Sequence, residues 1–148
     1  MTTSPSLSDF LSTARREFSF LVSEFGFVEQ PDNRPYPNAY SVCYATPTTA
    51  VTVEGTNWGF GVQVMLRSVL PVPGAPQEVP LWALVEHRAP EESQLPSGQL
   101  AQLAYYASQH RRHADDVLRG IVTSFPAAHD VIDFHAAEVA KPKKRRLP

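Results

Sequence analysis

The chain has 148 residues, of which 43% are hydrophobic and 10% aromatic, and this is enough apolar material for the core of one domain. Five of the 13 cations lie in 141–148, which leaves 1–140 with eight cations against 15 acids and a net charge of −7. This acidic body excludes nucleic acid as its partner, because binding to phosphates needs Lys and Arg. The single cysteine excludes an intrachain disulfide and predicts a reducing compartment.

The sequence indicates a soluble, cytoplasmic, bacterial protein. The opening MTTSPSLSDF lacks the basic and apolar stretches of a secretory signal. No stretch approaches the about 18 consecutive apolar residues of a membrane span, so no membrane contact is expected. Many Pro and Ala residues, with arginine as the cation of 1–140, are typical of a GC-rich bacterial genome.

A helix is predicted at the start of the chain, because apolar residues recur there at helical spacing. Ser6 and Asp9 resemble a capping box, and Gly26 is placed to end the helix. Phe27–Gln30 is expected to begin a short strand, and prolines at 31–38 predict a loop. The residues on the expected buried side of the helix are Leu7, Phe10, Leu11, Ala14, Phe18, Leu21, Val22 and Phe25.

Residues 39–70 predict three antiparallel strands, because apolar residues occupy alternate positions in AYSVCYA, AVTVEG and WGFGVQVML. A loop at Thr46–Thr49 sets Tyr44 opposite Val51, and a short turn at 56–57 sets Val53 opposite Phe60. The predicted inner rows are Tyr44–Val51–Val62, Val42–Val53–Phe60 and Tyr40–Gly55–Trp58. The predicted outer rows are Ala45–Ala50–Gln63, Cys43–Thr52–Gly61 and Ser41–Glu54–Gly59.

The outer rows are small and polar, so helices are expected to cover one side of the sheet only. The outer face is then either plain solvent-exposed surface or a flat face that binds a partner chain. The candidate partner-binding residues on it are Ser41, Thr52, Glu54, Gly61 and Gln63.

Helices dominate the second half of the chain. Residues 81–87 fit an edge strand or a short helix, and we favour a helix with Pro80 in its first turn. A long helix is predicted over 98–119 and ends at Gly120. A last helix over 126–140 has Ser124 as its candidate cap. The expected buried side of the long helix comprises Leu100, Leu103, Ala104, Ala107, Ala114, Val117 and Leu118.

These elements predict one α+β domain over 1–140, followed by a disordered basic tail over 141–148. Its antiparallel meander has three to five strands. An N-terminal helix and two C-terminal helices cover one face of this sheet. The tail is expected to be solvated, with contact to an anionic surface as the alternative.

No residue pattern predicts catalysis, a metal or a cofactor. His110 and His113 share a helical face, but no third ligand stands at a diagnostic spacing, and a solvated charged face is expected instead. Cys43 lies within a strand without an activating neighbour in the sequence. The motifs GxSxG, GxxxxGK[ST], GxGxxG and HExxH do not occur.

The segments FLSTARREFSFLVSEFGF, SVCYAT, AVTVEG, WGFGVQVML, PLWALVEHRAPEE and LAYYASQHRRHADDVLRG together resemble a group of small bacterial proteins. In that group a helix ends in "GF", a meander follows, and a later helix ends in a phrase like "DVLRG". Some members are similar to immunity proteins of polymorphic toxin systems. The shared motifs are structural, so the resemblance implies no site residue.

Two functions follow as hypotheses. The first is a non-enzymatic protein that binds another protein, either a basic one such as a toxin that it neutralises or a second copy of itself. The alternative is an enzyme or small-molecule-binding protein with a pocket between sheet and helices, lined by Tyr40, Tyr44, Trp58 and Trp82.

Overall fold

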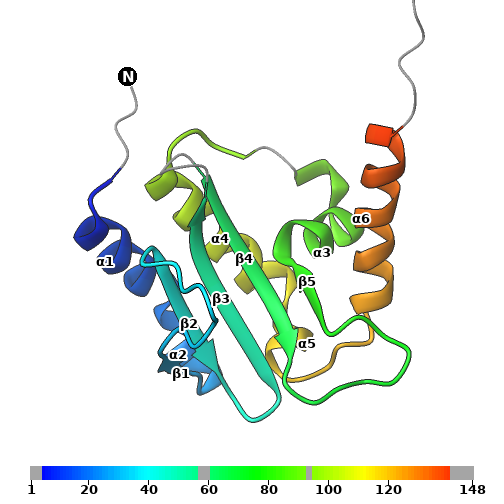
Figure 1. The fold of residues 1–148 in the computed structure, drawn as a ribbon, viewed down its shortest axis with the longest axis horizontal. Helices are drawn as coiled ribbons and strands as arrows, with labels where there is room; N and C mark the ends of the chain where they lie inside the picture. Colours follow the sequence, from blue (N-terminus) through cyan, green and yellow to red (C-terminus); the bar gives the residue numbers. More distant parts are fainter. Residues whose placement is uncertain (1–4, 57–60, 93–94, 141–148) are drawn as a thin grey trace, which may run out of the picture.

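The computed structural model describes residues 5–56, 61–92 and 95–140. One open sheet contains five strands, each antiparallel to its neighbour, in the order β1-β2-β3-β4-β5. The strands are β1 (Val28–Gln30), β2 (Ser41–Ala45), β3 (Thr49–Thr56), β4 (Gly61–Ser68) and β5 (Glu78–Pro80). Helices cover one face of this sheet, and the β1–β2 connection crosses the other (Figure 1). The predicted α+β class is confirmed.

The helices form two groups around the sheet. The N-terminal pair is α1 (Leu7–Glu17) and α2 (Ser19–Phe25), and the later helices are α3 (Leu81–Arg88), α4 (Gln99–His113), α5 (Asp115–Leu118) and α6 (Phe125–Ala140). In Figure 1, α1 and α6 lie at opposite ends of the sheet. Within the described residues, every helix is too short or too polar to cross a membrane.

The predicted first helix is broken at Phe18. The side chain of Ser6 caps its start by accepting from the Asp9 N–H, and Gly26 ends its second part in the left-handed conformation, both as predicted. A straight helix cannot bury both Phe18 and Phe20, because positions i and i+2 point to different sides. The break allows both rings to enter the core, whereas Val22, which we expected there, is half exposed.

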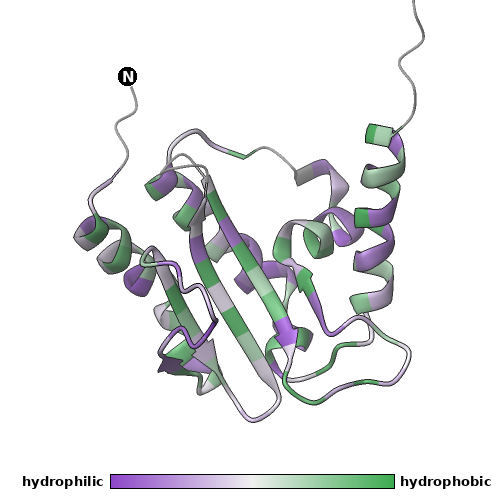
Figure 2. Ribbon diagram, viewed as in Figure 1, coloured by the Kyte–Doolittle hydropathy of each residue, from purple (hydrophilic) through white to green (hydrophobic). Residues whose placement is uncertain are grey.

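Apolar and polar residues alternate along the strands, and this gives the sheet one buried face. Figure 2 shows apolar and polar residues alternating along β2, β3 and β4. The predicted pairing of β2 with β3 is confirmed, since Tyr44 lies opposite Val51 and Val42 opposite Val53. These side chains are at most 3% exposed and form one core with the helices.

The predicted register of β3 with β4 is wrong by four residues. The observed pairs include Val51–Leu66, Val53–Val64, Gly55–Val62 and Thr56–Gly61. On the outer face, Thr52 therefore lies opposite Met65 instead of Gly61. Alternation determines which face of the sheet each side chain occupies, but it leaves the register undetermined by any even number of residues. A shift of four residues therefore leaves each side chain on its predicted face. The predicted pairs with 58–60 lie outside the described residues.

α4 buries a polar side that the sequence reading did not identify. Gln99 donates from Nε2 to the Gly61 carbonyl over 2.9 Å, and Gln102 accepts from the Val62 N–H over 2.9 Å. The two side chains thus hold the first two residues of β4. Because this side of α4 faces the sheet, Leu100 and Ala104 are exposed instead of buried as expected.

The predicted long helix ends early, at His113, and α5 follows after Ala114. Arg88 stabilises this break, because its guanidinium donates to the freed His113 carbonyl and forms an ion pair with Asp116 over 2.6 Å. The hydrogen bond from Arg88 also lowers the pKa of the Asp116 carboxyl. One arginine therefore joins the end of α3 to the turn between α4 and α5.

Residues 81–88 form the helix α3, as we favoured, and Pro80 stands at its N-cap position. Ser124 precedes α6 but does not act as the predicted side-chain cap. Its hydroxyl is buried and has no hydrogen-bond partner among the described residues.

Gly120 lies against the tip of the β2–β3 hairpin. Its φ of +89° is in the left-handed region, and an added Cβ would lie 2.8 Å from Thr48 Oγ1 and 3.0 Å from Thr48 Cβ. Beside it, the Thr49 hydroxyl donates to the buried Val117 carbonyl over 3.1 Å. The DVLRG segment thus docks the hairpin tip, and its role in the fold is structural.

His110 is fully buried, which contradicts the predicted solvated face. Its ring lies 6.0 Å from the rings of both Phe18 and Phe20, and neither ring nitrogen has a hydrogen-bond partner among the described residues. Burial lowers the pKa of His110 to about 3, because the apolar surroundings disfavour the charged imidazolium.

Replacing Gly120 with Ala should destabilise the protein through both strain and close contact. We expect a loss of about 2–4 kcal/mol in the free energy of unfolding, measured by urea titration. Gly74→Ala is the matched control, because Gly74 has a φ of +76° with no atom within 4 Å of an added Cβ. Equal losses in the free energy of unfolding of the two variants would show that the contact with Thr48 does not contribute to stability.

His110→Leu should reduce the loss of stability in acid. The unfolded state takes up a proton near the ordinary pKa of 6.5, whereas folded His110 stays neutral down to about 3. The wild type should therefore lose about 1.4 kcal/mol relative to the variant for each pH unit between these values. Urea titrations from pH 7 to 4 measure this difference, with exposed His87→Leu as the control. Parallel profiles for the wild type and His110→Leu would contradict the assignment.

Candidate functional site: the uncovered face of the sheet

The outer face of the sheet, defined as the face opposite the helices, is hollowed into an open concavity of about 620 Å³. Its floor consists of small residues, because the cross-strand pairs Ala45–Ala50 and Cys43–Thr52 lie side by side there. Longer side chains of β4 and the β1–β2 loop surround this floor. The lining residues at these two edges include Pro31, Asp32, Arg34, Met65 and Arg67.

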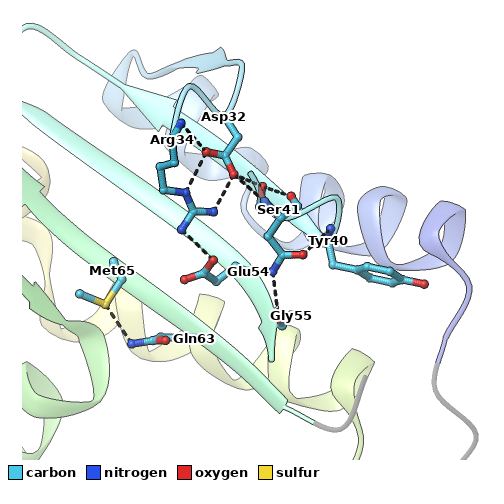
Figure 3. A network of polar contacts seen from close by, with 9 residues as sticks. Asp32, Arg34, Tyr40, Ser41, Glu54, Gly55, Gln63 and Met65 are labelled. Atoms are coloured by element: carbon cyan, nitrogen blue, oxygen red, sulfur yellow. Dashed lines mark hydrogen bonds and ion pairs between the residues drawn. The ribbon is translucent and has the colours of Figure 1, made fainter. Parts of the chain in front are cut away.

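Asp32 organises the loop at one edge of the concavity (Figure 3). Its carboxylate accepts from Arg34 Nε over 2.8 Å and from Arg34 Nη2 over 2.6 Å. It also accepts from the backbone N–H groups of Arg34 and Asn38, each over 3.2 Å. The Asp32 carboxylate therefore holds the loop closed by bonding to both its start and its end.

Arg34 connects this loop to the sheet. Its Nη1 donates to Glu54 Oε2 on β3 over 2.9 Å, so one guanidinium bridges two carboxylates (Figure 3). The hydrogen bonds from Arg34 hold the pKa of the Asp32 carboxyl well below its usual range. The hydrogen bond to Asp32 in turn raises the pKa of Arg34. Since the Asp32 and Glu54 side chains are only 12% and 15% exposed, this network is a partly buried, charge-assisted one.

Asn38 anchors the other end of the loop to the sheet. Its Nδ2 donates to the Gly55 carbonyl over 2.9 Å, and its Oδ1 accepts from the Tyr40 N–H over 3.0 Å. The Ser41 hydroxyl lies 2.7 Å from the Asn38 carbonyl and 3.1 Å from Asp32 Oδ2. The loop therefore has fixed polar contacts on both sides and forms a preorganised edge of the concavity.

The structure brings three of the five sequence-predicted site residues to this concavity. Thr52, Glu54 and Gln63 line it, with Glu54 directly opposite Gln63 in the sheet. Ser41 belongs to the network around Asp32 and is not among the lining residues. Gly61 is buried, and its carbonyl is held by α4 on the other side of the sheet.

Sequence reasoning missed Asp32 and Arg34, because it treated 31–38 only as a loop. The Asp-x-Arg spacing is a usable local signal, since an Asp side chain commonly accepts from the backbone N–H two residues later. The contact from Arg34 to Glu54 spans 20 residues and has no signal in a single sequence.

The groups in the concavity are suited to binding more than to catalysis. Burial raises the pKa of Cys43, so its thiol is protonated and weakly nucleophilic at neutral pH. Asp32, Arg34 and Glu54 form ion pairs with one another that leave one net negative charge. At the far edge, Arg67 and Glu78 are exposed and lie opposite each other across β4 and β5. Among the described residues, no three His, Cys, Asp or Glu side chains are grouped as metal ligands.

The aromatic residues expected to line one pocket lie in different places. Tyr40 packs edge-to-face on Phe10 at a centroid distance of 5.4 Å, and Tyr44 is buried on the inner face of the sheet. Trp82 lines a separate cavity between α3 and α4. Position 58 lies outside the described residues. The three described members of this set therefore lie in three different surroundings.

Comparisons with protein-family models, curated proteins and solved structures found no match to this chain.

Asp32→Asn should loosen the loop and destabilise the protein, because the amide cannot replace the ionic bonds to Arg34. We expect a loss of about 1–3 kcal/mol at pH 7, with faster amide exchange over 33–38. The pKa of Asp32 is depressed, so its contribution is present above the ordinary value of 3.8 and is lost as the pH falls further. The difference in stability between the variant and the wild type should therefore begin to narrow below about pH 4.

Urea titration between pH 7 and 3 measures this effect. Exposed Asp130→Asn is the control and should leave both stability and amide exchange unchanged. A difference between Asp32→Asn and the wild type that did not narrow at all between pH 5 and pH 3 would contradict an ionic role for Asp32.

Proposed function

We propose that the protein acts without catalysis, by binding another protein through the outer face of its sheet in the cytoplasm of a bacterium. The concavity of about 620 Å³ supports this proposal most directly. Its floor is made of small side chains on the central strands, and its edge is a loop fixed by Asp32, Arg34 and Asn38. A rigid hollow of this kind suits a protruding loop or side chain of a partner, because little ordering is required on binding.

The charge of the chain favours a basic partner. Residues 1–140 carry a net charge of −7, and three acids against two arginines line the described concavity. A negative surface attracts a positively charged protein over a distance of about 8–10 Å at physiological salt. Toxin neutralisation is the specific form that we propose, since parts of the sequence resemble immunity proteins.

A second copy of the chain is the other protein partner that the sheet would accept. β1 and β5 are short edge strands of three residues each, so they offer few free backbone groups for strand addition. A dimer formed through the sheet would therefore use the outer face itself. Measuring the oligomeric state would then test whether the outer face binds a second copy of the chain.

Thr52→Arg should abolish partner binding without unfolding the protein. Thr52 lies on the floor of the concavity and is only partly buried, so the long side chain fills the hollow and adds a positive charge. Binding should fall at least tenfold in pull-downs from the source organism, with captured proteins identified by mass spectrometry. Analytical ultracentrifugation of the wild type separates self-association from binding of another protein.

Ala104→Arg is the matched control, because Ala104 is exposed on α4, on the helical side of the sheet. A photo-crosslinking residue at position 52 should capture the same partner, and one at 104 should not. The proposal fails if no partner is found at low or physiological salt. It also fails if Thr52→Arg retains the partner as well as Ala104→Arg does.

A further inference from the structure

A second cavity, of about 210 Å³, lies between α3 and α4. It is separate from the outer-face concavity and shares no lining residue with it. The lining residues are Trp82, Val85, Glu86, Leu95, Tyr105, Tyr106 and Gln109. Its walls are mostly apolar, yet they contain a carboxylate and a buried amide.

Three of these seven residues are aromatic, and they come from both helices. Trp82 lies on α3, whereas Tyr105 and Tyr106 are consecutive on α4, with their rings edge-to-face at 5.4 Å. Burial raises the pKa of Tyr106, so its phenol stays neutral. The face of an aromatic ring carries partial negative charge and attracts cations, with Trp the strongest of the three types.

The formal charge in the cavity wall is negative as well. Glu86 is the one charged residue among the described lining residues, and its side chain is 35% exposed. His135 of α6 holds the Glu86 carboxylate in place, with Nε2 at 2.8 and 2.9 Å from its two oxygens. The carboxylate is therefore partly desolvated and fixed beside the aromatic side chains.

Gln109 adds a polar atom that the fold itself does not satisfy. The residue is 5% exposed, and its Oε1 has no hydrogen-bond partner among the described residues. A buried carbonyl without a hydrogen-bond partner destabilises the folded protein. Because this oxygen is itself shielded from solvent, the aromatic side chains and the Glu86 carboxylate are the lining groups that favour a positive ligand.

We propose that this cavity binds a small organic cation with an alkylated ammonium head group. An alkylated ammonium has a positive centre with an apolar surface, which fits aromatic walls better than a strongly hydrated metal ion or primary amine does. The volume equals that of about seven water molecules, which is the size of a cation such as choline. This site does not depend on the proposed protein partner.

The test compares choline with 3,3-dimethylbutan-1-ol, in which a carbon replaces the charged nitrogen. Titrations followed by two-dimensional NMR at constant ionic strength should show saturable shifts at Trp82 and 105–109. The neutral alcohol should bind at least tenfold more weakly. Equal binding of the two would overturn the proposal in favour of a merely apolar cavity, and so would no saturable binding of choline up to tens of millimolar.

Variants locate the binding in this cavity. Trp82→Leu should weaken choline at least tenfold, Trp82→Phe should keep most of the affinity, and Glu86→Gln should weaken it about five- to tenfold. Tyr36→Leu and Glu78→Gln are matched controls, because Tyr36 is 94% exposed and neither residue lines the cavity. Thr52→Arg should also leave choline binding unchanged. Equal loss in the control variants, or no loss in Trp82→Leu, would overturn the assignment.

Discussion

The burial of only one face of the sheet is the constraint on which the rest of the structure depends. The helices lie on that side of the sheet, with α6 packed against α3 and β5 at one edge, so alternate residues of β2, β3 and β4 form the core (Figure 1). The remaining residues must tolerate water, and the neighbouring Cys43, Ala45, Ala50 and Thr52 of β2 and β3 are small. Because these side chains are short while Arg34 and Met65 nearby are long, the uncovered face becomes concave. The candidate binding surface is thus a direct consequence of one-sided packing.

One-sided packing also explains why so many hydrogen bonds and ion pairs hold the β1–β2 loop. A loop without regular structure that crosses a sheet has backbone groups that the strands do not pair. Asp32 and Asn38 satisfy several of these groups, and Arg34 bridges the two carboxylates that the arrangement brings together. The loop is therefore held by polar contacts in place of a hydrophobic core. Such an edge keeps its shape while leaving the hollow beside it open.

The sequence was sufficient to predict the features that depend on local period. The α+β class, the one-sided sheet, the β2–β3 register and the caps of the first helix follow from alternation, spacing and turn residues. Features that depend on contacts between residues far apart in the sequence could not be predicted. The β3–β4 register was wrong because alternation fixes only parity, and the polar side of α4 was missed because Gln99 and Gln102 look solvent-exposed until β4 is in place. The same reason applies to the bond between Arg34 and Glu54.

α4 shows how structural and functional reasons for burying polar groups can be separated. At its first turns, Gln99 Nε2 and Gln102 Oε1 bond to the backbone of β4, which explains the burial of these two groups, whereas Gln99 Oε1 has no hydrogen-bond partner among the described residues. At its last turns, Gln109 Oε1 and both His110 nitrogens lack partners in the described part of the chain, and burial there lowers stability. His110 lies among phenylalanine rings and lines neither cavity discussed above, and its burial lowers the stability of the protein in acid. Gln109 lines the aromatic cavity, where a cationic ligand would bring positive charge close to its oxygen.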